Sequence, residues 1–466
     1  MTTIPVLTEG TFDELAASLS GALHLPGTAD YERLATPWNV AVPARAAAVV
    51  EAADAADVAT AVRFANRAGI VVAVRATGHG ASSDLDGQLL VHTGRLDELV
   101  VHEEGWARIG SGVKWGPVLE AAAPFGLAPL VGSAPDVGAV GYLTGGGLGP
   151  VARTYGIASD TVRAFDVVTG DGELRRATPD ENPSLFWALR GGKGALGIVT
   201  AVEIDLVRQP TVYGGALFFS AADTDDVVRA WAEWSPGLDR QGTTSLAINR
   251  LPELPFLPEP IAGKQTVSVR FAWTGDPAEG ERAFAAMASA AAPVFGGIGV
   301  MPYAAIGMIH SDPVDPLPSH EEFSLLRGLP ADAVEALLDV AGAGAASLQL
   351  VTELRLLGGA LDEPSAQPSA FGEIDAAYTL LTVGIAAGPA VDLSVTDGRG
   401  IHEALAPWAT GRQLPNFAPA DDAEHIRRIY DESTLARLAS LIAAFDPRGV
   451  IAVGRPLRAA VAAATA

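Results

Sequence analysis

Three glycine-rich segments contain the residues best suited to chemistry. The first includes His79 within residues 77–80, while residues 138–149 hold six glycines and residues 191–197 hold four. Glycine allows positive φ and a close approach of the backbone, so amide groups in such segments can surround an anionic ligand. One cluster alone is more often a structural turn, but three within ~120 residues favour a ligand site.

Standard phosphate motifs do not account for these segments. No Gly-Lys-Ser/Thr follows at the spacing of a Walker loop, and residues 145–149 lack the G-x-G-x-x-G fingerprint of dinucleotide folds. The chain has no cysteine, which removes disulfides, thiol nucleophiles, cysteine-ligated zinc and iron–sulfur clusters. None of its eight histidines forms the helical zinc pattern, so we expect no metal site.

The order of the motifs resembles that of the vanillyl-alcohol-oxidase superfamily, and specifically its berberine-bridge-enzyme-like branch of FAD-linked oxidases. Arg75-Ala76-Thr77-Gly78-His79-Gly80 resembles the R-x-G-G-H loop of this family. Further matches follow in the family's order over residues 40–205 and 410–457: Gly132 to Gly149, Tyr155 to Asp160, Asn182 to Thr200, and Phe445 to Val450.

The resemblance implies FAD bound covalently through His79. The family's second attachment point, a cysteine, is Ala134 here, so His79 would make the only bond. Val137 falls where the family controls oxygen access, which implies an oxidase. Backbone amides near Gly78 and Gly80 would hold the pyrophosphate, and Arg75 would offset its charge. The remaining residues that the resemblance places at the cofactor are Thr77, Gly138, Gly141, Tyr142, Thr144, Gly145, Gly146, Gly149, Gly197, Ile198, Val199 and Asn416.

Several positions depart from the family pattern. Asp136 replaces a small hydroxyl residue, either as a base near the ring or as a solvated turn residue, and the turn is favoured. Further departures are at Ala195, Leu196, Leu414 and Gly454, so no relative's catalytic base is copied onto this chain.

Candidate catalytic groups therefore remain hypotheses. Tyr378 and Glu373 are the candidates for a proton acceptor, although Glu373 could be solvent-exposed and Tyr378 a half-buried aromatic on the sheet. Tyr155 belongs to a well-matched segment and is expected beside the cofactor. The cavity walls are expected to be apolar, which favours a hydrophobic or aromatic substrate; possible lining residues are Trp273, Met308 and Phe323.

These residues need elements that position them. The apolar spacing over 46–69 predicts an amphipathic helix, followed by a buried strand over 71–75. A strand over 162–168 precedes Asp171-Gly172, a hairpin signal. Farther along, a strand over 267–273 and a helix over 332–342 are expected.

We predict an α+β protein with a two-domain PCMH-type FAD-binding fold. The length of 466 residues favours two domains. Residues 1–205 would form the FAD-binding domain, and residues 410–466 would return to it. Residues 206–409 would form an α+β substrate domain, an antiparallel sheet backed by helices, with the cofactor between the domains.

Charge and composition restrict the partners. A formal net charge of −24 argues against nucleic acid and anionic membranes. No apolar run approaches the roughly 20 residues of a spanning helix, and Met1 to Val6 does not resemble a secretory signal. We expect a cytoplasmic monomer or homodimer. The Ala-rich composition suggests a GC-rich genome, in which relatives often modify secondary metabolites.

The predicted function is an FAD-dependent oxidase. It would remove a hydride from an alcohol or amine carbon of a small, hydrophobic or aromatic metabolite, with molecular oxygen as acceptor and hydrogen peroxide as product. Alternatives are a flavin dehydrogenase with another acceptor and a carbohydrate oxidase of the same branch. A non-catalytic flavin-binding protein is the least favoured.

Overall fold

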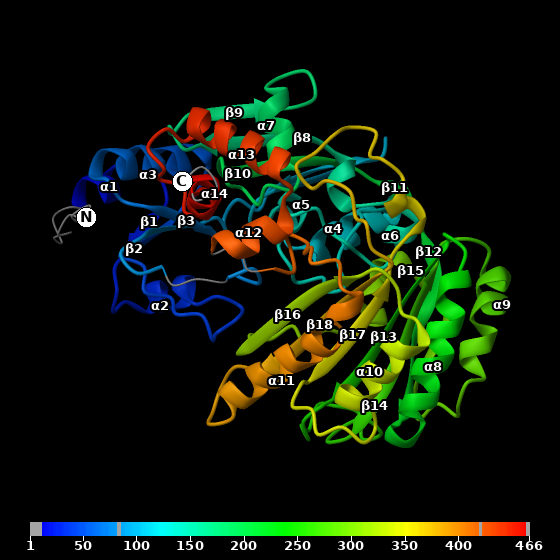
Figure 1. Cartoon of the computed structure of the whole chain (residues 1–466). Helices are drawn as coiled ribbons and strands as arrows, with labels where there is room; N and C mark the ends of the chain where they lie inside the picture. The colour runs from blue at the N-terminus through cyan, green and yellow to red at the C-terminus, as the bar shows by residue number, and fades with distance from the viewer. Residues whose placement is uncertain (1–11, 82–84, 419–421, 463–466) are drawn as a thin grey trace.

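The computed structural model describes residues 12–81, 85–418 and 422–462, and Figure 1 follows the chain from blue to red. The prediction for residues 1–6 lies outside these ranges. Among the helices within them, none has both the length and the apolar character needed to cross a membrane. The described strands form sheets of four, five, two and seven strands.

The first sheet carries the loop that contains His79. Its strand order is β1 (Ala22–His24), β2 (Ala48–Glu51), β4 (Leu89–His92), β3 (Val72–Arg75). The prediction of one helix over 46–69 is wrong at its start, because β2 is a buried apolar strand paired in parallel with β4. Helix α3 (Ala55–Ala68) begins only after Asp54, whose side chain accepts a hydrogen bond from the Asp57 amide.

The second sheet is antiparallel and has the order β5 (Leu99–His102), β6 (Trp106–Gly110), β10 (Gly197–Asp205), β8 (Val162–Thr169), β9 (Leu174–Ala177). The predicted hairpin after β8 is confirmed. Gly172 has a φ of +84° there, and its amide donates to Thr169 O at 2.8 Å.

The third large sheet is antiparallel and has the order β15 (Phe295–Pro302), β12 (Thr211–Ser220), β14 (Gln265–Trp273), β13 (Gly242–Arg250), β17 (Val351–Leu356), β18 (Tyr378–Ile385), β16 (Ser319–Leu326). One face is covered by the helices α8 (Thr224–Trp234), α9 (Pro277–Ala288), α10 (Ala331–Ala341) and α11 (Val391–Ala404) (Figure 1). Val267, Val269 and Phe271 of β14 pack in the core beneath these helices. Because side chains alternate along a strand, Arg270 projects from the other face.

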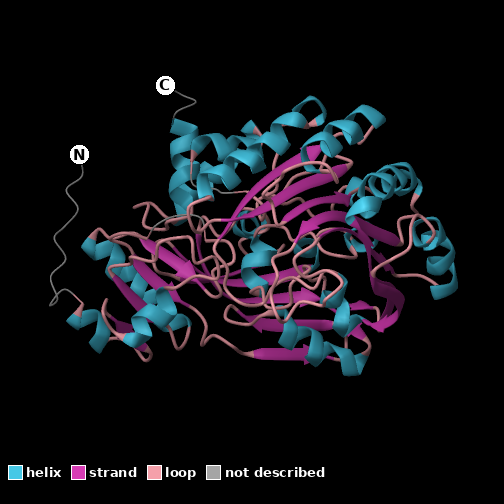
Figure 2. Cartoon of the chain, turned by 90° about the horizontal axis from the view of Figure 1, so that it is seen from below, coloured by secondary structure: helices cyan, strands magenta, loops and turns pink. Residues whose placement is uncertain are grey.

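Short elements connect the sheets, and Figure 2 shows helices gathered around the outside of the strands. The remaining described elements are α1 (Asp13–Ala17), α2 (Ala29–Ala35), α4 (Trp115–Ala122), η2 (Ala123–Phe125), β7 (Leu127–Ala128), α5 (Ala139–Thr144), α6 (Ala152–Tyr155), η3 (Ala158–Thr161), α7 (Pro183–Leu189), β11 (Val207–Arg208), η4 (Ala221–Asp223), η5 (Ser235–Gly237), η6 (Tyr303–Ile309), η7 (Gly359–Asp362), η8 (Ala406–Trp408), α12 (Ala423–Ile429), α13 (Glu432–Phe445) and α14 (Gly454–Ala462).

The C-terminal segment packs against the N-terminal part of the chain. The Val72 amide donates to Val450 O at 2.7 Å, and the Ala452 amide donates to Val72 O at 2.9 Å. Helices α12 to α14 share a core with residues of β6, β8 and β10, whereas a separate core lies under the seven-stranded sheet. Gly149 and Pro150 of the N-terminal part share a small cavity with Arg270 and Arg355, so this part of the chain lies against the uncovered face of the seven-stranded sheet.

Candidate cofactor and substrate site

His79 lies in a tight loop that directly follows β3. Gly78 has a φ of +83°, and an added Cβ there would lie 2.7 Å from Pro37 Cα, so only glycine fits. The imidazole stacks on Trp38, with ring centroids 4.7 Å apart and an interplanar angle of 19°. Its Nδ1 lies 3.0 Å from Thr77 Oγ1. The loop thus fixes the ring plane and leaves the ring edge facing the interior.

Asp136 is the closest charged partner of His79. The Nε2 and Oδ2 atoms are 3.2 Å apart, and only 18% and 13% of the two side chains are exposed. The favoured interpretation of Asp136 as a solvated turn residue is therefore wrong, because the loop turns the carboxylate inward. Burial lowers the pKa of His79, the charge of Asp136 opposes this and that of Lys114 adds to it.

The two glycine loops meet through backbone and amide contacts. Thr144 O accepts hydrogen bonds from the Gly191 amide at 2.9 Å and from the Lys193 amide at 3.0 Å. Asn416 donates from Nδ2 to Tyr142 O at 2.8 Å, and Lys193 Nζ donates to Asn416 Oδ1 at 3.3 Å. The C-terminal segment therefore joins the two loops through Asn416. The predicted position of Asn416 at the cofactor would need such a contact.

Lys193 also reaches the loop of His79. A Cβ added at Gly80 would lie 3.8 Å from Lys193 Nζ, and desolvation lowers the pKa of this ammonium group to about 8. Sequence reasoning missed Lys193. The available signal was a lysine between two glycines, and the structure shows that its backbone has a φ of +56°, which is uncommon for a residue other than glycine. It places a cation where the three segments converge.

The other predicted cofactor residues are divided between this convergence and the surrounding core. Gly138 begins α5 beside Thr77, Gly141 is open to its surroundings, and the hydroxyl of Tyr142 is buried without a hydrogen bond. Three loop glycines have no room for a Cβ. It would collide with Asn416 at Gly145, with Phe371 at Gly146 and with the Val131 carbonyl at Gly149. Gly197, Ile198 and Val199 pair with β8 inside the second sheet, and Val137 packs against its core.

Arg75 is buried, and its Nη1 donates to the carbonyl of Ala35. Burial lowers its pKa to about 10. This contact gives the guanidinium a role in holding α2 against the loop of His79.

The structure does not bring Tyr378 and Glu373 together with His79. Tyr378 lies under the helices, 2% exposed, with its hydroxyl 3.0 Å from Ser235 Oγ. Glu373 is exposed in the loop before β18. Tyr155 is closer to the loops, but its hydroxyl donates to Gln209 Oε1 at 2.5 Å and supports the connection to β12.

The uncovered face of the seven-stranded sheet carries a buried charge cluster that sequence reasoning missed. Glu353 accepts from Arg270 Nη1 at 2.7 Å and from Arg355 Nε at 2.6 Å. His310, which ends η6, has its Nε2 3.6 Å from the same carboxylate. The two guanidinium groups hold the pKa of Glu353 down at about 2, against its desolvation. The available signal was charged residues alternating with apolar ones within strands.

This polar face lies against the FAD-domain loops. A small cavity beside Arg270, His310 and Arg355 is closed on its far side by Gly149 and Pro150. The Arg355 guanidinium carbon also lies 5.8 Å from the ring centroid of Phe417, in the C-terminal segment. The cavity itself is small, about 20 Å³, and Phe417 lies next to it through its contact with Arg355.

The predicted apolar lining is only partly present beside that cavity. Phe323 stacks on Phe417 with ring centroids 5.0 Å apart and belongs to the cluster that includes Leu414. Trp273 instead lies in the core under the helices, and Met308 is 71% exposed. Phe323 and Phe417 form an apolar wall beside Arg355, next to the small cavity but not among the residues that line it.

Comparison with known proteins indicates which cofactor this part of the chain binds. Residues 46–178 match a family model described as an FAD binding domain. This chain carries an FAD-binding domain. The expected cofactor, FAD, is supported at this level, and the glycine loops and the buried unpartnered atoms around His79 fit such a ligand.

Curated relatives are similar to part of this chain. The chain is 34% identical over 196 residues to (R)-6-hydroxynicotine oxidase of Paenarthrobacter nicotinovorans, an alignment that covers 41% of this chain and 43% of that protein. The chain thus matches less than half the length of the first curated relatives.

Solved structures show the fold. The 6-hydroxy-D-nicotine oxidase of Arthrobacter nicotinovorans superposes with a TM-score of 0.82 at 24% identity, covering 94% of this chain and 97% of that one. The BBE-like 1 protein of Physcomitrella patens gives 0.82 at 18% identity, with 95% and 98% coverage. The predicted α+β PCMH-type fold is therefore confirmed, and the match to an FAD-binding-domain model agrees with the resemblance.

A further neighbour bears on the attachment of the cofactor. Glucooligosaccharide oxidase of Acremonium strictum superposes with a TM-score of 0.78 at 20% identity, covering 94% of this chain and 96% of that one. Its description names a 6-S-cysteinyl, 8α-N1-histidyl FAD.

Proposed function

We propose that this protein binds FAD through a single covalent bond from His79 and oxidises an alcohol or amine carbon of a small molecule. Molecular oxygen would accept the electrons, giving hydrogen peroxide. FAD supplies the ring that accepts the hydride. The observation that carries the proposal is the placement of His79, with its Nε2 3.2 Å from the Asp136 carboxylate, within the residues that match an FAD-binding domain.

The contacts of His79 support the covalent bond. A carboxylate beside Nε2 favours the tautomer with its proton on that nitrogen, so Nδ1 keeps a lone pair, which faces the Thr77 hydroxyl at 3.0 Å and would form the bond once that hydroxyl turns away. Burial lowers the pKa of His79 and keeps the ring neutral, the form that acts as a nucleophile. The chain has no cysteine, so a second bond of the kind named for the glucooligosaccharide oxidase is not available.

Acid precipitation of the purified protein tests the attachment. Yellow colour should remain with the precipitated protein, and His79→Ala should release all of it. Asp136→Asn should lower the covalently bound fraction, because the amide no longer selects the tautomer by charge. His102→Ala is the matched control, since His102 also stacks on a tryptophan, Trp106, outside the loops. Full release of flavin from the unaltered protein would falsify the proposal.

The acceptor is tested separately. Protein reduced in the absence of air is mixed with oxygen in a stopped-flow cell. Reoxidation within seconds, with hydrogen peroxide formed, agrees with an oxidase, and reoxidation over minutes favours a dehydrogenase with another acceptor. Val137 would leave oxygen a path to the ring, so Val137→Leu should slow reoxidation.

A further inference from the structure

The charge cluster on the uncovered face of the seven-stranded sheet is not balanced. Arg270 and Arg355 share the single carboxylate of Glu353, at 2.7 and 2.6 Å, and these three side chains are 8%, 15% and 3% exposed. His310 adds no charge at neutral pH, because burial and the two guanidinium groups lower its pKa to about 3. The ion pairs alone therefore leave one guanidinium charge uncompensated, in a chain whose net charge is −24, and Asp312 acts on Arg355 without forming an ion pair with it among the described residues.

Hydrogen-bonding groups around the cluster also lack partners. Among the described residues, Arg270 Nε, Ser245 Oγ, Tyr142 Oη and both ring nitrogens of His310 are buried without a hydrogen bond. His310 is 9% exposed and Ser245 is 4% exposed, so bulk water does not replace the missing partners. A buried polar group without a partner destabilises the fold, because its desolvation is not compensated. Most of these groups are donors, so the complement that they need is rich in acceptors.

The position of these groups ties them to the substrate space. Arg270, Ser245, His310 and Arg355 line one cavity together with Gly149 and Pro150, which end the long glycine loop. Arg355 also lies over the Phe417 ring, beside the apolar wall described above. A carboxylate bound at this cavity would meet Gly149 and Pro150 of the long glycine loop and the positive cluster, and the apolar wall lies next to it at Arg355.

We propose that Arg270 and Arg355, with His310 and Ser245, bind a carboxylate carried by the substrate. This inference rests on the proposed function and gives the substrate class: a small molecule with an apolar body, an oxidisable alcohol or amine carbon, and a carboxylate. Guanidinium groups bind carboxylates through paired, charge-assisted hydrogen bonds. The carboxylate would neutralise the leftover charge and accept from the unpartnered donors.

The test compares acids with their uncharged amides on the flavin-loaded protein. Benzoate, phenylacetate and hexanoate, and the amide of each, are titrated by calorimetry, which does not depend on a flavin signal. We expect at least one acid to bind roughly tenfold to a hundredfold more tightly than its amide, the range of a charge-assisted hydrogen bond. Equal binding of acids and amides, or no binding by any acid, overturns the proposal.

Variants locate the effect. Arg355→Met should weaken the binding of the best acid roughly tenfold or more, while Glu353 keeps Arg270 as its partner. Arg355→Lys should lie between, because it keeps the charge and loses the paired geometry. The matched control is Arg229→Met, which removes an arginine from the helix-covered side of the same sheet. An unchanged affinity in Arg355→Met also overturns the proposal.

The outcomes separate the two proposals. A protein that retains flavin and is reduced by a substrate, but does not distinguish acids from amides, contradicts only the carboxylate site. A protein that holds no flavin after purification and reconstitution contradicts the proposed function itself.

Discussion

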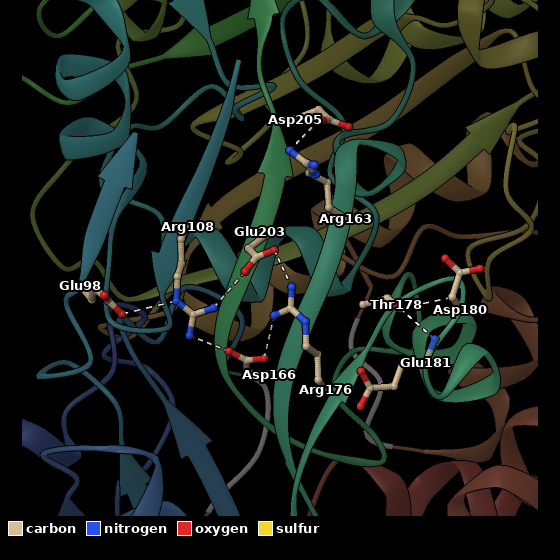
Figure 3. A network of polar contacts seen from close by, with 10 residues as sticks. All are labelled: Glu98, Arg108, Arg163, Asp166, Arg176, Thr178, Asp180, Glu181, Glu203 and Asp205. Carbon is tan, nitrogen blue, oxygen red and sulfur yellow. Dashed lines mark hydrogen bonds and ion pairs between the residues drawn. The ribbon is translucent and has the colours of Figure 1, made fainter. Parts of the chain in front are cut away.

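Two networks of arginine and carboxylate residues lie on two sheets of this protein, and they differ in what is left unpaired. On the second sheet, Arg108 and Arg176 alternate with Asp166 and Glu203 in a closed ring with contacts between 2.6 and 3.3 Å (Figure 3). Every carboxylate oxygen of that ring has an arginine partner, and the four side chains are 16–38% exposed. On the seven-stranded sheet, Arg270 and Arg355 share one ion-pair partner, Glu353, and the three side chains are only 3–15% exposed.

The difference distinguishes an ion-pair network that only stabilises the fold from one that can bind a ligand. In the ring, Asp166 lies directly opposite Arg176, and Glu203 directly opposite Arg108, so register alone pairs the charges. Solvent screens them, and nothing is missing. In the buried cluster the charges do not cancel and donors stay without acceptors. An incomplete buried network favours a ligand, because leaving it incomplete is costly.

The largest expected difference is in stability. Glu353→Gln leaves two buried guanidinium groups without a counter-charge, so we expect a loss of about 3–5 kcal/mol in the free energy of unfolding. Glu203→Gln, in the ring on the second sheet, should lower the free energy of unfolding by less than about 1 kcal/mol. Urea unfolding of both variants at pH 7 measures the difference. Similar losses in the two variants would show that burial does not separate the networks.

The next effect is a pH dependence carried by His310. Its folded-state pKa of about 3 lies below the ordinary 6.5, so the unfolded chain takes up the proton first as the pH falls. The stability that a neutral His310 contributes is therefore present above pH 6.5 and is lost as the pH falls toward 3. The charged groups acting on it are Arg270, Arg355, Glu353 and Asp312.

His310→Gln should reduce the slope of unfolding free energy against pH between 6 and 4 by up to about 1.4 kcal/mol per pH unit. Urea unfolding at pH 6, 5 and 4 measures this slope at constant ionic strength. The contribution of Glu353 stays in both proteins, because its pKa of about 2 places its loss below pH 4.5. Parallel curves for the two proteins would contradict the assignment.

The smallest effect belongs to the exposed ring. Arg108→Met leaves Asp166 and Glu203 paired with Arg176, so we expect a loss below about 1 kcal/mol that shrinks further in 1 M salt. Thermal unfolding at low and high salt checks both parts. A loss of several kcal/mol that is insensitive to salt would mean that the ring behaves like the buried cluster.

Sequence reasoning was strongest where a function depends on the backbone. The glycine clusters, the loop after β3 and the segment containing Asn416 lie together in the structure, since glycine spacing limits which backbone paths are possible, and their role at the cofactor stays a prediction. It was weakest for side chains on strands. Tyr378 and Arg355 sit on neighbouring strands, yet one lies under the helices and the other faces the loops.

By itself, the sequence indicated an FAD-binding domain, which the match over residues 46–178 supports, and its family resemblance implied attachment through His79, because the chain has no cysteine for the other bond. Only the tertiary structure decided that Asp136 turns inward to His79 and that Arg270, Glu353, Arg355 and His310 meet on one face. The physical reason is that burial and charge pairing depend on contacts between distant segments. Residue type and spacing state which groups are present, and packing decides which of them remain unpaired.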